Sequence, residues 1–402
     1  MANDIAVYTV IHQPRRLKLP AQPIPKNATV EDIERCLFDE RMNERYFEKV
    51  ATWCYYPATQ MFLELVNNNN FKMSIGFSES FLRQARTWDT NLFNLFKQLV
   101  AHKNVEPVCV EPYHSFIPLI DLPQFKDRME WARLNIEQTF GKKPVITDTT
   151  EMIMSDGIYH ALYSLDFKAA LMDGRSWVLG WRDATHLYHQ GKDMALLTRH
   201  YELSDDVGYR FSNQGWWGYP LMANEYAHWL HEARGDFVFL AWDYETFGEH
   251  HSKDTGIFEF MYRFPVELSK QKMKVRTPSE IIKKYRKYSH DLPLSPYPCT
   301  WAGEGGIEFF LGNDAQQSVF QLMLHAYNKA LLTENPELID LALWLVQSDN
   351  LHLIQWFGRS GSDAEVSAYF TPNEWWQLGP NGIIGEMQQV FKNFIQSLDA
   401  YL

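Results

Sequence analysis

A short stretch of the chain concentrates acidic, histidine and aromatic side chains directly after an apolar segment. The segment Phe237–Ala241 predicts a buried strand, and Trp242–His251 follows it with the sequence WDYETFGEHH. In α/β enzymes, ligands and catalytic side chains collect just past the C-terminal ends of strands. A solvated acidic loop would not need aromatic residues between its charges. The pattern therefore indicates the wall of an active site, in which Asp243 and Glu245 are candidate acids.

A further candidate carboxylate, Glu151, follows the short apolar segment Val145–Thr147. Glycoside hydrolysis needs two carboxylates from separate strand ends, one as nucleophile and one as acid and then base. The retaining route places these two groups about 5–5.5 Å apart. Asp148 and Glu151 also have the spacing of a helix capping box, which is a purely structural interpretation. On spacing alone, both interpretations stay open.

Two histidines, His12 and His114, each follow an expected strand. A single histidine at such a place is more often hydrogen-bonded and structural than functional. With Asp243 and His250 they could ligate a metal ion, as in a metal-dependent hydrolase or deacetylase. None of these four residues belongs to an HxxxH or DxxH motif that would support that alternative. We therefore expect no metal, and we interpret both histidines as candidates for binding sugar hydroxyl groups.

Strands that alternate with helices must position these side chains. Seven apolar segments predict strands: Ile5–Ile11, Phe71–Phe77, Val105–Val110, Val145–Thr147, Phe167–Met172, Trp177–Trp181 and Phe237–Trp242. Helices are expected over Glu79–Ala101 and Leu122–Phe140, and Asn67–Asn70 predicts a turn. Polar groups gathered after the strands of such a pattern indicate a parallel barrel or a doubly wound sheet.

The Pro-rich segment Leu292–Pro298 interrupts this alternation, and the chain beyond it is mainly helical. The clearest helices there are expected over residues 315–332, 336–347 and 384–400. We therefore expect a catalytic barrel domain over residues 1–290. A mainly helical C-terminal region over residues 291–402 is expected to complete the cleft.

Composition limits the partners and the surroundings of the protein. The 402 residues carry a net charge of −12, which argues against a nucleic-acid partner. The four cysteines form no CxxC pair and no zinc-ligand spacing, which indicates free thiols in a reducing compartment. No signal peptide and no apolar run of about 20 residues is visible, so we expect a soluble, cytoplasmic protein without a membrane partner. The sequence does not predict the oligomeric state.

Several motifs together resemble glycoside hydrolase family 57, and its α-amylase branch in particular. His12-Gln13-Pro14 is similar to the first signature of that family, and Thr150-Glu151 is similar to its nucleophile region. The octapeptide Asp243–His250 matches the acid/base region in full. Further similar blocks run along nearly the whole chain: Phe47–Val50, Cys54-Tyr55, Phe77-Ser78, Val178–Arg182, Leu203–Asp206, Arg210–Ser212, Trp301-Ala302 and Leu311–Asn313.

The resemblance implies an α/β fold, namely an incomplete (β/α)7 barrel followed by a C-terminal helical region. It also implies an α-glucan or oligosaccharide substrate, a retaining mechanism, and no cofactor. Carried over by position, Glu151 is the nucleophile and Asp243 the general acid/base. Orienting or substrate-binding roles are expected for the remaining residues of the matching regions: His12, His114, Trp181, Glu245, Trp301 and Asp349.

The sequence departs from the family pattern beside the expected nucleophile. The family usually has Arg-Asn-Thr before this glutamate, whereas this chain has Asp148, Thr149 and Thr150. A carboxylate in place of a guanidinium brings a like charge to Glu151, which disfavours its ionised form. The segment Gly303–Phe310 also lacks the usual pattern of acidic and basic residues. A second hypothesis is therefore a catalytically weakened or inactive α-glucan-binding homologue.

Overall fold

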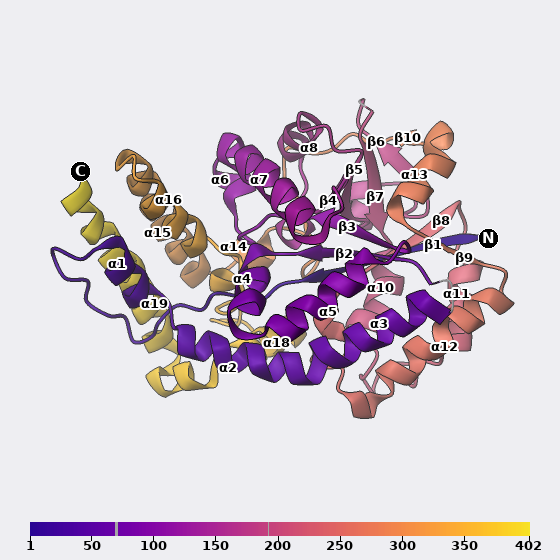
Figure 1. The fold of residues 1–402 in the computed structure, drawn as a ribbon, viewed down its shortest axis with the longest axis horizontal. Helices are drawn as coiled ribbons and strands as arrows, with labels where there is room; N and C mark the ends of the chain where they lie inside the picture. Colours follow the sequence, from indigo (N-terminus) through magenta and orange to yellow (C-terminus); the bar gives the residue numbers. More distant parts are fainter. Residues whose placement is uncertain (69–70, 192) are drawn as a thin grey trace. The chain divides into compact units, whose positions relative to one another are not determined.

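The computed structural model describes residues 1–68, 71–191 and 193–402, so the turn expected at Asn67–Asn70 lies partly outside the described residues. The chain forms two compact units (Figure 1). The first, here called the barrel unit, consists of residues 1–13, 46–112 and 123–301. The second, the helical unit, consists of residues 14–45, 113–122 and 302–402. Every strand of the described sheet belongs to the barrel unit.

Parallel strands form the centre of the barrel unit. Within the described residues these are β1 (Asp4–Ile11), β2 (Met73–Phe77), β3 (Val105–Cys109), β4 (Ile146–Thr147), β5 (Ala169–Asp173), β7 (Ala195–Arg199) and β8 (Phe237–Asp243). Their order is β7-β5-β4-β3-β2-β1-β8, and each neighbouring pair is parallel. Three short strands extend the sheet: β6 (Leu187–His189), β9 (Lys274–Arg276) and β10 (His290–Asp291).

The two ends of this strand order, β7 and β8, come back together. The His200 N–H, directly after β7, donates to the carbonyl of Phe239 on β8 over 2.9 Å. The Nε of Arg199 donates to the carbonyl of Ala241 over 3.0 Å. The sheet is therefore curled, and the expected fold, an incomplete (β/α)7 barrel with a C-terminal helical region, is confirmed.

Helices cover the outside of the barrel sheet. In the barrel unit they are α3 (Tyr56–Asn68), α4 (Glu79–Trp88), α5 (Thr90–Ala101), α7 (Leu122–Phe140), α8 (Asp156–Tyr163), α10 (Tyr201–Gly208), α11 (Ala223–Glu232), α12 (Ile257–Lys270) and α13 (Pro278–Tyr285). The helix expected over Glu79–Ala101 is divided in two, because Asp89 ends α4 and its side chain caps α5 by accepting the Leu92 N–H.

The helical unit gathers short and long helices from three parts of the chain. They include α1 (Val30–Leu37), α6 (Ile117–Ile120), α14 (Glu308–Leu311), α15 (Asp314–Leu332), α16 (Pro336–Leu345), α17 (Asp349–His352), α18 (Ser362–Phe370) and α19 (Gly379–Ser397). Helix α2 (Glu40–Val50) begins in this unit and ends in the barrel unit. None of the helices in the described parts of the chain is long and apolar enough to cross a membrane.

The prediction of a strand at Trp177–Trp181 is wrong. Residues Ser176–Leu179 form the short helix α9, and Gly180 ends it with φ 64°, a left-handed conformation that glycine adopts without a Cβ clash. Periodicity does not distinguish a short apolar run in a strand from one in a helix. The strand that occupies the corresponding place in the barrel is β7, which the sequence analysis did not identify.

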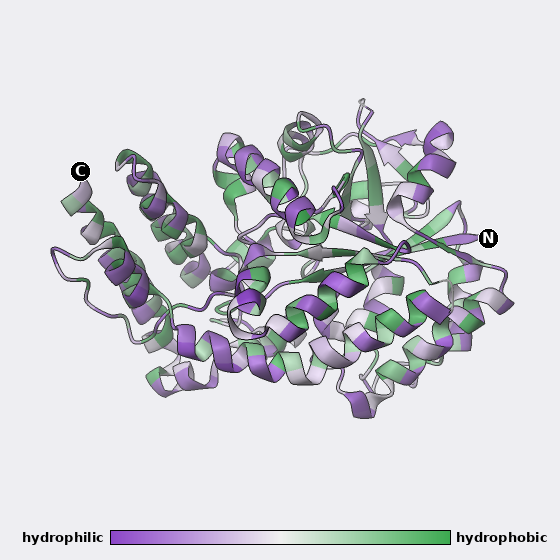
Figure 2. Ribbon diagram, in the orientation of Figure 1, coloured by the Kyte–Doolittle hydropathy of each residue, from purple (hydrophilic) through white to green (hydrophobic). Residues whose placement is uncertain are grey.

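Alternate residues of the strands fill two apolar layers. On β1, Ile5 and Val7 belong to the cluster between the sheet and the outer helices, whereas Ala6 and Tyr8 belong to the cluster inside the barrel. Hydrophobic and hydrophilic residues alternate around the outer helices (Figure 2), as expected for helices with one buried face. Because both faces of the strands are buried, the polar side chains collect past the strand ends.

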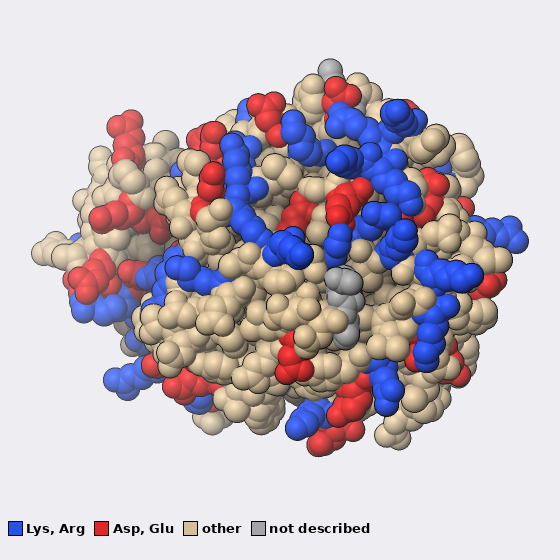
Figure 3. Space-filling view, turned by 45° about the vertical axis from the view of Figure 1, so that its right-hand side comes forward, with Lys and Arg blue, Asp and Glu red and all other residues tan. Residues whose placement is uncertain are grey.

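Although the chain has a net negative charge, it contains a locally basic segment. Lys270–Lys287, which includes β9 and α13, is rich in Lys and Arg, and Glu280 is its single acidic residue. Arg276 and Lys284 of this segment both form ion pairs with Asp4, so part of its charge is neutralised. Figure 3 shows many Lys and Arg side chains on one face, with Asp and Glu among them.

Candidate active site

Glu151 lies in a short loop after β4 that is bonded to a distant part of the chain. We call this segment, residues 148–154, the Glu151 loop. The Trp301 N–H donates to the carbonyl of Glu151 over 3.2 Å. Met154 and Cys299 exchange two backbone hydrogen bonds of 2.9 Å each. The end of the barrel unit therefore runs antiparallel to the Glu151 loop and fixes its position.

An indole group orients the Glu151 side chain. The Nε1–H of Trp301 donates to Oε2 of Glu151 over 2.7 Å, and the Thr300 hydroxyl donates to the Glu151 carbonyl over 2.7 Å. Glu151 and Met152 have φ values of 54° and 51°, in the left-handed region. Such backbone conformations cost on the order of 1–3 kcal/mol in non-glycine residues and cluster at functional sites. The bonds from Thr300 and Trp301 help to hold this strained conformation.

Asp148 lies inside the barrel and not at a helix end. The Tyr8 hydroxyl donates to Oδ2 of Asp148 over 2.7 Å, and the Thr149 N–H donates to Oδ1 over 2.8 Å. The capping-box interpretation of Asp148 and Glu151 is therefore wrong. Burial raises the pKa of Asp148 to about 7, the charge of Asp243 raises it further, and the two hydrogen bonds act in the opposite direction. Near neutral pH, Asp148 is therefore a partly protonated residue at the start of the Glu151 loop.

Asp243 is the last residue of β8, at the carboxyl edge of the sheet. It is aligned with Val10 near the end of β1, so it lies beside the strand that leads to His12. Burial raises the pKa of Asp243 to about 6, while the positive charges of Arg199 and His12 lower it. A carboxyl group with such a pKa can both give and take a proton near neutral pH.

Arg199, the last residue of β7, supplies a fixed positive charge near Asp243. Its buried guanidinium bonds to Asp173, at the end of β5, over 3.2 Å, and it also pairs with Asp205. Arg175 pairs with the other oxygen of Asp173 over 2.7 Å. The sequence analysis missed Arg199 and Asp173. Arg199 could have been found if the apolar run before it had been recognised as strand β7, because Arg199 is the last residue of that strand.

A chain of side-chain hydrogen bonds holds Glu245 in the turn after β8. The Tyr55 hydroxyl donates to Glu245, and the Nε2 of Gln13 donates to Tyr55 over 2.8 Å. Burial raises the pKa of Glu245 well above its usual range, and the charge of Asp243 adds to this effect. Tyr55 and Gln13 stand in matching motifs, but the sequence alone did not indicate that they contact Glu245.

The remaining candidates fall in both units. His12 follows β1 in the barrel unit, and its Nδ1 is 2.9 Å from the hydroxyl of Ser78. Trp181 also belongs to the barrel unit and is 87% exposed. His114 and Asp349 belong to the helical unit. The barrel unit thus brings Glu151, Asp243, Glu245, His12 and Trp301 to the carboxyl edge of its sheet. The roles of His114, Trp181 and Asp349 stay predictions, and so does the metal hypothesis, which uses residues of both units.

Known proteins share this fold along the whole chain. A 4-alpha-glucanotransferase from Thermococcus litoralis superposes with a TM-score of 0.67 at 14% identity, covering 100% of this chain and 60% of the glucanotransferase. A GH57-type branching enzyme from Pyrococcus horikoshii superposes with a TM-score of 0.65 at 13% identity, covering 99% of this chain and 97% of the branching enzyme. This chain therefore spans less than two thirds of the glucanotransferase and nearly all of the branching enzyme.

Sequence comparison gives the family directly. A Methanocaldococcus jannaschii protein named "Putative alpha-amylase" is 33% identical over 376 residues, which cover 90% of this chain and 78% of that protein. The model of glycosyl hydrolase family 57 matches residues 6–293. This range includes Glu151 and Asp243. It ends before Cys299, Thr300 and Trp301, which bond to the Glu151 loop. The chain belongs to glycosyl hydrolase family 57.

Proposed function

We propose that the protein is a retaining glycoside hydrolase that acts on α-glucans, with Glu151 as nucleophile and Asp243 as general acid/base. One observation supports this most strongly. Two carboxyl groups at the carboxyl edge of the sheet, one after β4 and one at the end of β8, have different environments. Burial raises the pKa of Asp243 to about 6, whereas Glu151 is partly exposed and oriented by Trp301. Such a difference suits one carboxyl group to proton transfer and the other to nucleophilic attack.

In the proposed first step, protonated Asp243 donates its proton to the leaving glycosidic oxygen while a carboxylate oxygen of Glu151 attacks the anomeric carbon. The glycosidic bond breaks and a glycosyl ester of Glu151 forms. In the second step, Asp243, now a carboxylate, takes a proton from water, whose oxygen attacks the anomeric carbon and releases Glu151. The indole of Trp301 keeps the Glu151 carboxylate in one orientation through both steps.

The charged groups around Asp243 support this cycle. Asp243 must exist in both protonation states near the working pH. Burial raises its pKa, and the charge of Arg199 limits that rise. Without Arg199, the pKa of Asp243 would be higher and the acid would release its proton less readily in the first step. We further propose that His12 and Glu245 in the barrel unit, together with His114, Trp181 and Asp349, bind or orient the sugar.

The test is the release of reducing ends from soluble starch and maltooligosaccharides. Glu151→Gln and Asp243→Asn are each expected to lower turnover at least about a thousandfold, because each removes a reacting group. Asp254→Asn, an exposed acid of the barrel unit, serves as the matched control and is expected to retain activity. Proton NMR of the first product is expected to show the α-anomer before mutarotation.

Two results would decide against the proposal. Unchanged turnover in Glu151→Gln would show that another group is the nucleophile. A wild type that binds maltooligosaccharides in calorimetry but releases no reducing ends would support the α-glucan-binding homologue instead. The departure of Asp148, Thr149 and Thr150 from the family pattern is the reason for testing this second candidate, the α-glucan-binding homologue.

A further inference from the structure

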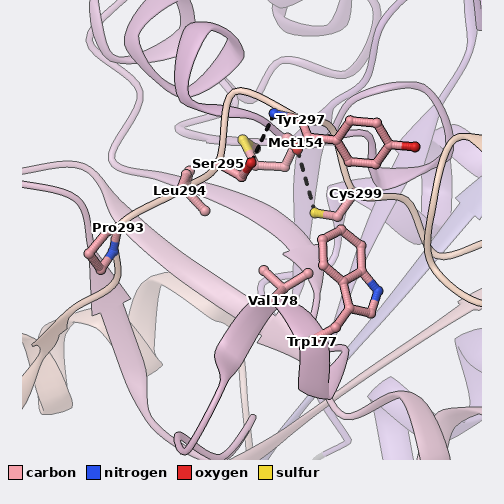
Figure 4. A pocket seen from close by; sticks show the side chains of 8 residues that line it. All are labelled: Met154, Trp177, Val178, Pro293, Leu294, Ser295, Tyr297 and Cys299. Atoms are coloured by element: carbon pink, nitrogen blue, oxygen red, sulfur yellow. Dashed lines mark hydrogen bonds between the residues drawn. The ribbon is translucent and has the colours of Figure 1, made fainter.

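We propose a sugar-binding subsite in the barrel unit, in a cavity next to the Glu151 loop, that takes a glucose unit of an α-glucan away from the bond that is cut. This inference rests on the proposed function. The cavity has a volume of about 390 Å³, which lies in the range of roughly 300–1,000 Å³ typical of small-molecule sites. Its walls include Trp177 of α9 and Tyr297 of the Pro-rich segment (Figure 4).

The chemistry of the lining favours a neutral sugar. Trp177 and Tyr297 are each 47% exposed, so their rings still have surface to bury against a ligand. Ser295 adds a hydroxyl group, and none of the described residues that line the cavity is a carboxylic acid or a basic residue. Aromatic faces bury the C–H faces of sugar rings, and hydroxyl groups hydrogen-bond to sugar hydroxyls. A phosphate or a carboxylate ligand would find no charged partner among these described lining residues.

Hydrogen bonds to the rest of the barrel unit preform the cavity. The Leu294 N–H donates to the side chain of Gln190 over 2.5 Å, and the Ser295 carbonyl accepts the Asp156 N–H over 2.9 Å. The segment also contains Pro293, Pro296 and Pro298, whose rings fix the backbone φ angle. The wall that carries Tyr297 is therefore ordered before any ligand binds, which lowers the entropic cost of binding.

One residue of the Glu151 loop, Met154, forms part of the cavity wall. Met154 and Cys299 both line the cavity, and the same two residues exchange the backbone hydrogen bonds that fix the loop. Figure 4 shows the Cys299 thiol directed to the Met154 carbonyl. Glu151 stands three residues before Met154. A sugar unit in the cavity would therefore lie beside the loop that carries Glu151, and we expect it to belong to a glucan longer than the two units on either side of the bond that is cut.

Calorimetry with the Glu151→Gln enzyme tests this without turnover. Adding Trp177→Ala is expected to weaken maltoheptaose binding about tenfold while maltose binding stays unchanged, because only the longer chain reaches the cavity. Tyr297→Ala is expected to act in the same direction, and Tyr297→Phe to retain most of the affinity, since the ring face is kept. Trp131→Ala on α7, 40% exposed, is the matched control and is expected to bind like its parent.

Kinetics with the active enzyme separate this inference from the proposed function. Trp177→Ala is expected to raise KM for maltoheptaose with little change in kcat, as expected when binding to ground and transition states is lost equally. One outcome would contradict the subsite alone: all cavity variants, including the mild Tyr297→Phe and Trp177→Phe, bind maltoheptaose like their parent while the wild type hydrolyses starch. The proposed function would then still hold. If the cavity variants weaken binding but the wild type never hydrolyses, the subsite stands and the function is wrong.

Discussion

The buried carboxyl group of Asp148 makes the stability of the protein depend on pH in a specific direction. Its pKa rises from the ordinary 3.8 to about 7 in the folded protein. Between these values the folded protein holds a proton on Asp148 that the unfolded chain has released. Folding therefore takes up a proton in this window, and the free energy of unfolding falls as pH rises through it. Below about pH 4 ionisation of Asp148 causes no loss of stability, and above about pH 7 the loss has reached its full size.

The size of the effect follows from the shift. At about 1.4 kcal/mol per pKa unit, ionised Asp148 costs the folded protein about 4 kcal/mol above pH 7. Asp148→Asn keeps the shape and removes the charge. One amide oxygen can still accept the Thr149 N–H, and the amide N–H can donate to the Tyr8 oxygen. We expect the variant to gain about 2–4 kcal/mol over the wild type when pH rises from 4.5 to 8.

The assay is thermal or urea unfolding followed by circular dichroism, for wild type and Asp148→Asn, from pH 4.5 to 8.5. Other buried carboxyl groups titrate in both proteins, so the difference between the two curves isolates Asp148. The exposed substitution Asp254→Asn is the control and is expected to give a flat difference curve. A flat difference curve for Asp148→Asn as well would refute the reasoning, because Asp148 would then be equally charged in the folded and unfolded states.

Three further predictions concern the residues around this site. The pKa of Asp243 at about 6 predicts that kcat/KM falls as pH rises above about 6, because the general acid loses its proton; a pH–rate profile without this alkaline limb contradicts the assignment. Trp301→Phe removes the indole N–H that holds Glu151, and we expect kcat to fall about 10–100-fold with an unchanged unfolding midpoint, measured beside Trp131→Phe. Gly76→Ala places a Cβ 2.5 Å from the Tyr8 hydroxyl, so we expect the free energy of unfolding to fall by about 1–3 kcal/mol, and equal stability would show that the barrel interior can adjust.

Local patterns in the sequence predicted most of the barrel. The strands β1, β2, β3, β5 and β8 were expected within a few residues of their bounds, because each is an apolar run bounded by polar or turn residues. The error at Trp177–Trp181 has a physical cause: a short apolar run packs equally well as one turn of helix. The same ambiguity hid β7 and with it Arg199, which lies at the end of that strand.

The side-chain partners in the site were not predictable in this way. The residues that hold Glu151 and Glu245 are Trp301 and Tyr55, which lie 150 and 190 residues away in the sequence. No periodicity of a single segment encodes such contacts. The motifs identified Glu151 and Asp243 by resemblance, and the fold was needed to show which neighbours set their charge and orientation.

The same limit applies to the helical unit. The sequence analysis placed its C-terminal helices correctly, since 315–332, 336–347 and 384–400 correspond to α15, α16 and α19. It did not assign residues 14–45 and 113–122 to that unit, because both lie between segments of the barrel. Which unit a connecting segment joins depends on long-range packing and not on local composition.

The pairing between the Glu151 loop and residues 299–301 also determines when, during synthesis, the site can form. All strands of the described sheet end by Asp291, whereas Trp301, which orients Glu151, is made 150 residues after it. At about 5–20 residues per second, the ribosome needs roughly 8–30 s to cover that distance. During that time Glu151 lacks the residue that orients it, although the strands on either side of its loop, β4 and β5, have already been made. We expect catalytic competence to appear only after residues 299–301 have been made and have paired with the Glu151 loop.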